Sequence, residues 1–114
     1  MKKVLHVITR SVRGGAQQVC LDIVTSLDPA RYAAEVACGR EASRNWLAEE
    51  LTARGIQVHL IPSLKRDISP TADLRCLFSL YRLLKHGKFD IVHCHSSKAG
   101  ILGRLAARLA GTPH

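Results

Sequence analysis

Residues 4–17, VLHVITRSVRGGAQ, and residues 89–100, FDIVHCHSSKAG, share one layout. Each opens on a short apolar run that contains β-branched residues, which is typical of a strand buried on both faces of a sheet. Each then passes through a turn into residues with helical spacing. In an open α/β sheet, ligands bind at the carboxyl ends of the strands, where the strand order reverses. We therefore expect the two turns to line one cleft, provided that their strands lie side by side.

The remaining sequence continues this alternation of strands and helices. Apolar residues at helical spacing predict helices over about residues 16–27, 43–55, 71–86 and 97–110. Short apolar runs predict strands over residues 4–8, 32–38, 56–61 and 89–93. Because such an alternation makes right-handed crossovers, it predicts a mainly parallel sheet with helices on both faces. The predicted fold class is α/β, a Rossmann-like three-layer sandwich.

The composition is that of one folded domain. The chain has 114 residues, of which 46% are hydrophobic and 23% charged, so disorder is not expected. No apolar run approaches the roughly 18 residues of a membrane-spanning helix, and the run after Lys2 and Lys3 is too short for a secretory signal. The cysteines form no C-x-x-C pair, which indicates buried, reduced thiols of a cytoplasmic protein at Cys20, Cys38, Cys76 and Cys94.

The net charge is strongly positive, at +8 from 17 Lys and Arg against 9 Asp and Glu. Such an excess favours an anionic partner, which is a nucleic acid, an anionic membrane surface or a phosphorylated small molecule. The aromatic residues are few and do not interleave with the basic ones, so a base-stacking nucleic-acid surface is poorly supported.

The first turn carries a glycine pair, Gly14 and Gly15. Glycine permits positive φ and a close approach of ligand to backbone, and the helix that follows offers free N–H groups and a positive dipole end to a phosphate. Arg13 adds positive charge beside them. The patterns G-x-G-x-x-G and G-x-x-x-x-G-K-[ST] are absent, so a tight turn with only a structural role is an equal alternative.

The second turn is richer in polar groups. Ser96 or Ser97 can cap the last helix and leave hydroxyl and N–H groups facing the cleft. Lys98 opposes the helix dipole, a cost that an anionic ligand would explain, although its side chain can also simply extend into solvent. His93 and His95 share one side of the strand if the strand extends that far. Since no third ligand is evident from the sequence, we expect hydrogen-bonded or substrate-contacting histidines and no metal.

The last helix is rich in small residues. Gly100 and Gly103 weaken a helix by up to ~1 kcal/mol each, so we expect close packing of both on the sheet as compensation. Asp67 and Asp73, in or beside the third strand–helix loop, have no role that the sequence suggests.

These segments resemble the amino-terminal domain of family 4 glycosyltransferases, which are retaining enzymes of the GT-B fold that use nucleotide-sugar donors. The resemblance rests on residues 4–8, 13–17, 91–100, 103–107 and 110–113, and so extends along the whole chain. The Gly-Gly-Ala-Gln loop combined with His-x-His-Ser-Ser-Lys-Ala-Gly is similar to members that build bacterial surface polysaccharides. Together with the doubly wound topology, the resemblance implies the sheet order 3-2-1-4 of one half of a GT-B fold.

The resemblance also implies roles for individual residues. Gly14 and Gly15 would approach the donor diphosphate. Contacts to the acceptor or a phosphate would come from Arg13, Gln17, His95, Ser96, Ser97 and Lys98. The nucleotide-sugar is a substrate, so no cofactor is implied, and neither is nucleic acid. The acceptor that the resemblance implies is a glycan or a lipid-linked sugar.

The end of the sequence suggests that the domain continues. Residues 111–114, GTPH, resemble the start of a further strand. We therefore expect residues 1–114 to be a truncated amino-terminal domain, inactive alone, which lacks the carboxy-terminal donor-binding domain of the family. The alternative function is a non-catalytic, Rossmann-type nucleotide- or phosphate-binding module.

The family also bears on where the protein acts. Many relatives use lipid-linked acceptors at the inner membrane face, which implies a cytoplasmic protein with peripheral membrane attachment. The residues that could contact anionic lipid are Lys65, Arg66, Arg75, Arg82, Lys85 and Lys88. An ordinary solvated helix face explains them equally well.

Overall fold

The computed structural model describes residues 2–9, 14–40, 45–64 and 69–113. In these residues strands and helices alternate strictly. They are β1 (Lys2–Ile8), α1 (Gly15–Ser26), β2 (Tyr32–Gly39), α2 (Trp46–Ala53), β3 (Gln57–Ile61), α3 (Pro70–Gly87), β4 (Ile91–Cys94) and α4 (Ser97–Ala110).

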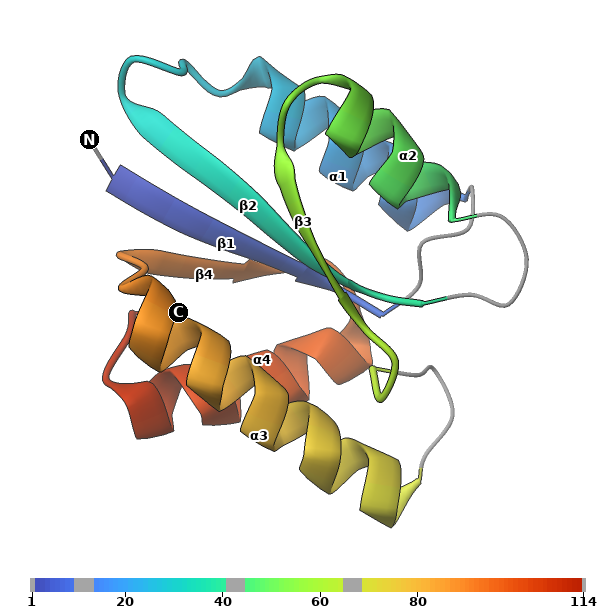
Figure 1. The fold of residues 1–114 in the computed structure, drawn as a ribbon, viewed down its shortest axis with the longest axis vertical. Helices are drawn as coiled ribbons and strands as arrows, with labels where there is room; N and C mark the ends of the chain where they lie inside the picture. Colours follow the sequence, from blue (N-terminus) through green and yellow to red (C-terminus); the bar gives the residue numbers. More distant parts are fainter. Residues whose placement is uncertain (1, 10–13, 41–44, 65–68, 114) are drawn as a thin grey trace.

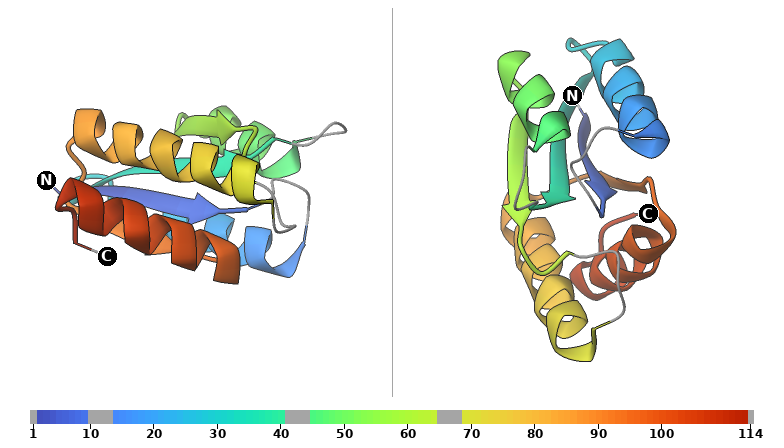
Figure 2. Two further views of the ribbon diagram at one scale, coloured as in Figure 1. Left: turned by 90° about the horizontal axis from the view of Figure 1, so that it is seen from below. Right: turned by 90° about the vertical axis from the view of Figure 1, so that its right-hand side faces the viewer.

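The strands form one parallel sheet in the order β3-β2-β1-β4. Helices α1 and α2 cover one face of this sheet, and α3 and α4 cover the other (Figure 1). The right-hand view of Figure 2 shows the same three layers, with the strands between the two pairs of helices. The predicted Rossmann-like sandwich and its order 3-2-1-4 are both confirmed.

Successive side chains of β1 point into two hydrophobic cores, one on each face of the sheet. Leu5 and Val7 pack in the core beneath α3 and α4, whereas Ile8 packs beneath α1 and α2. Because successive side chains of a strand point to opposite faces, His6 lies on the same face as Ile8. Among the described residues His6 is the only buried histidine, and its side chain lies on the face of the sheet that α1 and α2 cover.

The last strand begins later than the sequence predicts. Phe89 is buried in the core instead of extending the strand, and the Lys3 ammonium lies 4.6 Å from the centroid of its ring. The Asp90 carboxylate accepts a hydrogen bond from the Lys3 backbone N–H at 2.7 Å. Through these contacts Phe89 and Asp90 hold the start of β1 in place. Strand β4 begins after them, at Ile91.

The two glycines of α4 differ. A Cβ at Gly103 would lie 2.5 Å from the Cys94 sulfur, so glycine there allows α4 to pack closely on β4. A Cβ at Gly100 would meet nothing within 4 Å. The expected close packing is thus confirmed for Gly103 and wrong for Gly100.

The chain returns to the sheet after α4. Gly111 adopts a left-handed φ of 75° and ends the helix, as its position in the sequence predicts. The Val92 backbone N–H then donates a hydrogen bond to the Pro113 carbonyl at 2.9 Å. Residue 113 consequently lies beside β4, on the edge opposite β1.

All four cysteines are free thiols. Cys20, Cys38 and Cys76 are buried, as expected, and Cys94 is half-buried. Burial raises the pKa of Cys20 to about 12, which keeps that thiol protonated and unreactive.

Candidate functional site

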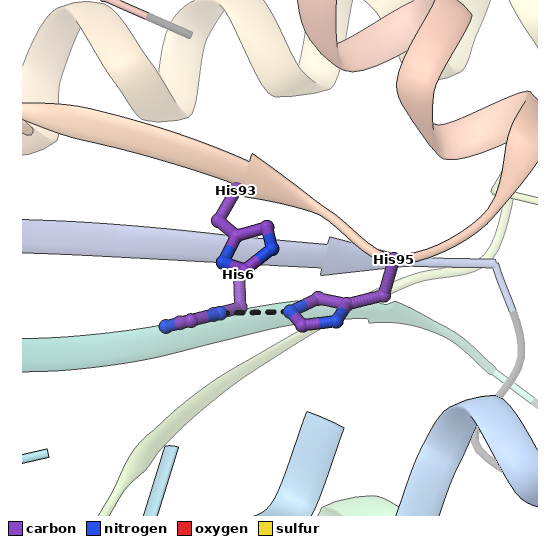
Figure 3. A group of neighbouring side chains, drawn as sticks. All are labelled: His6, His93 and His95. Carbon is purple, nitrogen blue, oxygen red and sulfur yellow. Dashed lines mark hydrogen bonds between the residues drawn. The ribbon is translucent and has the colours of Figure 1, made fainter. Parts of the chain in front are cut away.

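Three histidines gather on one face of the sheet at β1 and β4 (Figure 3). His6 and His93 are direct partners in the parallel register of these two strands. His95 follows two residues after His93, which returns its side chain to the same face. The ring centroids of His93 and His95 lie 4.3 Å apart, and that of His6 lies 5.2 Å from His93 and 5.1 Å from His95.

The three side chains of the histidine cluster (His6, His93 and His95) differ in burial, and not all of their ring nitrogens have a hydrogen-bond partner. His6 is 1% exposed, His95 is half-buried and His93 is exposed. His6 Nδ1 and His95 Nε2 share a hydrogen bond of 2.9 Å. The second ring nitrogen of His6, Nε2, is buried without a hydrogen-bond partner among the described residues. Buried polar atoms are rarely left in this state, so the cluster calls for an explanation.

Electrostatics keep the inner two rings neutral. Burial, followed by the neighbouring His95 and His93, lowers the pKa of His6 to about 3. Burial, followed by the proximity of His93, lowers the pKa of His95 to about 4. At neutral pH both rings therefore present nitrogen lone pairs rather than positive charge.

Sequence reasoning identified two of these histidines and missed the third. His6 stands inside an apolar run and gives no motif of its own. Its proximity to His93 depends on the register between strands that are more than 80 residues apart in sequence. The one available signal was alternation, which places His6 on the face opposite Leu5 and Val7.

The carboxyl ends of β1 and β4 are tied together next to this cluster. The His95 backbone N–H donates to the Val7 carbonyl at 2.9 Å, and the Thr9 hydroxyl donates to the Ser96 hydroxyl oxygen at 3.2 Å. Since β1 and β4 are neighbours, the first condition for a shared cleft is met. Helices α1 and α4 follow the carboxyl ends of these two neighbouring strands in the chain.

Ser96 occupies the N-cap position of α4, but its side chain makes no capping hydrogen bond. Its hydroxyl binds Thr9 instead. The first N–H groups of α4 are therefore not capped by that hydroxyl, and the positive end of the helix dipole faces this edge of the sheet. The side chain of Ser97, the other predicted cap, lies outside the described part of the structure.

Gly14 and Gly15 do not use the conformational freedom of glycine. Gly14 is the N-cap of α1 with an extended φ of −173°, and neither glycine has positive φ. Small size matters at Gly14 alone, where the near atom is the end of a flexible side chain. A Cβ at Gly14 would lie 2.8 Å from the Gln17 side-chain oxygen, whereas one at Gly15 would meet nothing within 4 Å. Arg13 lies outside the described residues.

Lys98 has a partner within the protein. Its ammonium lies 2.6 Å from a carboxylate oxygen of Asp73, in the first turn of α3. The Lys98 side chain is 15% exposed, so it does not simply extend into solvent. The ion pair explains why a lysine is tolerated in the first turn of α4 and gives Asp73 a role that the sequence did not suggest. It also ties the start of α4 to α3.

Comparisons with known proteins define the family. Residues 14–114 match the glycosyl transferase 4-like domain. The UDP-Gal:alpha-D-GlcNAc-diphosphoundecaprenol alpha-1,3-galactosyltransferase of Escherichia coli is 39% identical over 111 residues, which are 97% of this chain and 28% of that protein. The capsular polysaccharide biosynthesis glycosyltransferase CapH of Staphylococcus aureus is 32% identical over 95 residues, 83% of this chain and 24% of that protein.

A solved structure supports the fold independently. MurG of Acinetobacter baumannii superposes with a TM-score of 0.75 at 23% identity, covering 99% of this chain and 34% of that one. At this identity the likeness concerns the fold alone. The chain belongs to the glycosyl transferase 4-like family, and it spans about 28% of the length of its Escherichia coli relative.

Proposed function

We propose that this chain is the amino-terminal, acceptor-side domain of a retaining hexosyltransferase. In this proposal the whole protein moves a sugar from a nucleotide-sugar to a lipid-linked or glycan acceptor during surface polysaccharide synthesis. The observation that carries the proposal is the 39% identity, over nearly the entire chain, to a galactosyltransferase that acts on a diphosphoundecaprenol-linked sugar. That relative forms an α linkage from UDP-Gal, whose galactose is itself α-linked, so retention of configuration is the outcome expected here too.

The geometry suggests how the domain would contribute. Helices α1 and α4 both begin at the carboxyl ends of neighbouring strands, and neither N-cap residue makes a side-chain capping bond. Such helix ends bind anionic groups. We assign the donor diphosphate to Gly14 and Gly15, and the acceptor or its phosphate to Arg13, Gln17, His95, Ser96, Ser97 and Lys98.

The division of labour follows from what this chain contains. At the carboxyl ends of β1 and β4 the described residues supply amide dipoles, hydroxyls and neutral imidazole, groups that can bind and orient substrates. A neutral His95 would serve as a hydrogen-bond partner for an acceptor hydroxyl. We place the donor-binding half in a carboxy-terminal domain, as the resemblance implies, and expect no turnover from residues 1–114 alone. The non-catalytic phosphate-binding module is disfavoured by the family match.

The transfer reaction itself tests the proposal. The full-length protein would be incubated with a panel of UDP-sugars and an N-acetylglucosamine-diphospholipid acceptor, and product would be followed by mass spectrometry. We expect hexose transfer, and we expect Ser96→Ala to lower kcat/KM by about tenfold while the matched variant Ser26→Ala, at the last residue of α1, has no effect. Absence of transfer from every donor, with tight nucleotide binding, would favour the non-catalytic module.

A second part of the proposal concerns the membrane. No helix in the described part of the chain is long and apolar enough to span a bilayer. Helix α3 nevertheless exposes Leu74 (68%) and Phe78 (61%) beside Arg75 and Arg82, with the Arg82 guanidinium 5.9 Å from the centroid of the Phe78 ring. A cavity of about 1160 Å³ adjoins this α3 patch (Leu74, Arg75, Phe78 and Arg82), and Leu109 of α4 also lines it.

Exposed apolar side chains flanked by arginine suit peripheral docking on anionic lipid at the inner membrane face, since each basic residue near the surface contributes ~1 kcal/mol. Lys65 and Arg66, also candidates from the sequence, lie outside the described residues. Co-sedimentation with vesicles tests this part: binding should require anionic lipid and fall in the double variant Leu74→Ser, Phe78→Ser. Val19→Ser, an exposed apolar residue of α1, is the matched control. Equal binding to neutral and anionic vesicles would contradict docking of this patch on anionic lipid.

A further inference from the structure

The histidine cluster brings together three nitrogen ligands, of which only His95 has a part in the proposed transfer reaction. One ring nitrogen from each of His6, His93 and His95 lies within 4.8 Å of the other two. The cluster spans two strands held by a fixed backbone register, so its geometry does not depend on a flexible loop. We propose that these three imidazoles form a binding site for a divalent transition-metal ion of the zinc class.

The chemistry of the ligands fits such an ion. Imidazole nitrogen is the commonest protein ligand of such ions, and each of the three side chains of the cluster offers one. Cys94 does not contribute a thiolate, because its sulfur faces α4 at Gly103 on the other side of β4. An all-imidazole set suits Zn²⁺, Co²⁺, Ni²⁺ and Cu²⁺ and is a poor match for Mg²⁺ or Ca²⁺, which take oxygen ligands.

One of the three distances already approaches that of a tetrahedral site, and the nitrogen of His93, within 4.8 Å of the other two, must come closer. Zn–N bonds of about 2.0–2.1 Å place neighbouring nitrogens of a tetrahedral site roughly 3.3 Å apart. His6 Nδ1 and His95 Nε2 are now 2.9 Å apart, joined by a shared proton. If the ion binds these two nitrogens, that proton shifts to the other nitrogen of its own ring, and no proton is lost overall. His93, which is exposed, is free to turn its ring toward them.

The surroundings leave the ion accessible. His6 and His93 line a cavity of about 480 Å³ that is also bordered by Ile23 and Leu27, on and just beyond α1, and by Ile91 of β4. Three protein ligands with one position left open are the pattern of zinc sites that hold water or an exchangeable ligand. The fourth position would take water or an anionic oxygen entering from this cavity.

Metal binding can be measured apart from sugar transfer. Tag-free, full-length protein would be titrated with Zn²⁺ by calorimetry and with Co²⁺ by visible absorption, with Mg²⁺ as the negative ion. We expect one Zn²⁺ per chain, intense Co²⁺ absorption of the tetrahedral type and no heat with Mg²⁺. The variants His93→Ala and His95→Ala should each weaken Zn²⁺ binding by about tenfold or more.

The controls separate this proposal from the transferase assignment. His86→Ala removes an exposed histidine of α3, in the layer on the other side of the sheet, and should bind Zn²⁺ like the parent protein. Because His93 is exposed, His93→Ala is expected to fold, which its circular dichroism would verify. Failure to bind Zn²⁺, or Zn²⁺ binding that His93→Ala and His95→Ala leave unchanged, overturns the metal site whatever the transfer assay shows.

Discussion

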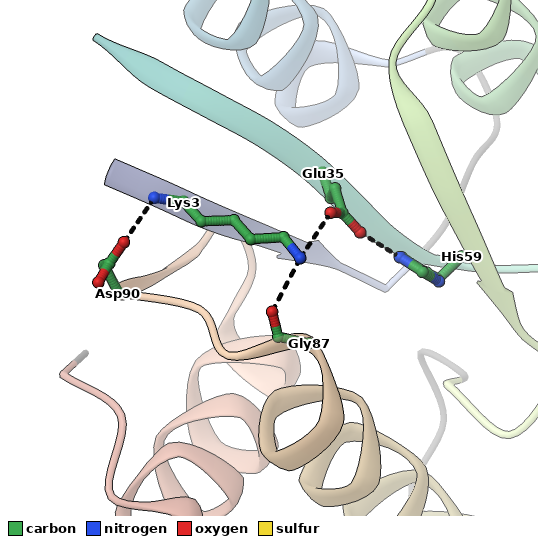
Figure 4. Close-up of polar contacts among 5 residues, drawn as sticks. All are labelled: Lys3, Glu35, His59, Gly87 and Asp90. Carbon is green, nitrogen blue, oxygen red and sulfur yellow. Dashed lines mark hydrogen bonds and ion pairs between the residues drawn. The ribbon is translucent and has the colours of Figure 1, made fainter. Parts of the chain in front are cut away.

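Two polar clusters sit on opposite faces of the same sheet, and they differ in how completely they are paired. On the α3 and α4 face, Glu35 accepts from the Lys3 ammonium at 3.2 Å and pairs with His59 at 2.7 Å (Figure 4). Lys3 also donates to the Gly87 carbonyl at 2.8 Å. On the α1 face, the histidine cluster has one internal hydrogen bond and an unpartnered buried nitrogen.

The difference separates a structural role from a binding role. The Lys3–Glu35–His59 cluster joins β1, β2 and β3 and has a partner for each charge, so it holds the sheet together. The histidine cluster lies next to the strand-end turns and leaves hydrogen-bonding capacity unused. A buried polar group without a hydrogen-bond partner lowers the stability of the fold. Such groups occur at functional sites, where a bound ligand can supply the missing partner.

We expect the largest difference in stability between two variants that each remove one central residue, Glu35 of the paired cluster or His6 of the histidine cluster. Glu35→Ala removes the shared partner of Lys3 and His59, so two pairs are lost at once, and it should lower the free energy of unfolding by about 2–3 kcal/mol. His6→Leu removes a ring whose Nε2 has no partner and replaces it with an apolar side chain of similar size, so the change should stay within about 1 kcal/mol. Urea denaturation of both variants measures the contrast. A larger loss for His6→Leu would show that the histidine cluster is the structural one.

The next effect concerns the helix that supports β4. Gly103→Ala drives a methyl group into the Cys94 sulfur and should cost about 1–3 kcal/mol. It should also displace His93 and His95 relative to His6, without touching Glu35. The matched substitution Gly100→Ala enters open space and should raise stability by up to about 1 kcal/mol. Thermal unfolding of the pair tests the packing, and equal shifts of Tm in one direction would refute it.

A smaller effect should follow from the Lys98–Asp73 ion pair. Asp73→Asn should destabilise the fold by about 1 kcal/mol, since the pair is partly exposed and solvent screens it. If Lys98 also contacts an anionic substrate, releasing it from Asp73 should change KM more than kcat. Steady-state kinetics with Asp73→Asn, compared with Asp22→Asn on exposed α1, would detect this.

The smallest effect is the part of the pH dependence of stability that Glu35 contributes. Burial alone would raise the pKa of Glu35, but hydrogen bonds from His59 and Lys3 outweigh burial and lower it below its ordinary value. The folded state therefore binds this proton less readily than the unfolded state. The stabilisation is complete above the ordinary glutamate pKa of about 4.5 and is lost as pH falls through the depressed value. Stability measured down through acid pH should decline less steeply in Glu35→Gln than in the parent protein.

The sequence predicted the parts of the molecule that depend on local pattern. Strand and helix order follows from apolar spacing, whereas the neighbouring placement of β1 and β4 was predicted from the doubly wound topology together with the family resemblance. His6 could not be assigned to the site, because its partners depend on strand register. Asp73 and the contrast between Gly100 and Gly103 depend on how α3 and α4 pack, which spacing along one helix does not reveal.

The most direct test of the central claim is a paired measurement on the full-length protein with two variants, His95→Gln and Glu35→Gln. Sugar-transfer rate and free energy of unfolding would be determined for each. The account predicts that His95→Gln lowers kcat/KM by about tenfold with little change in stability, while Glu35→Gln lowers stability and leaves kcat/KM unchanged. Loss of stability without loss of transfer in His95→Gln would contradict it.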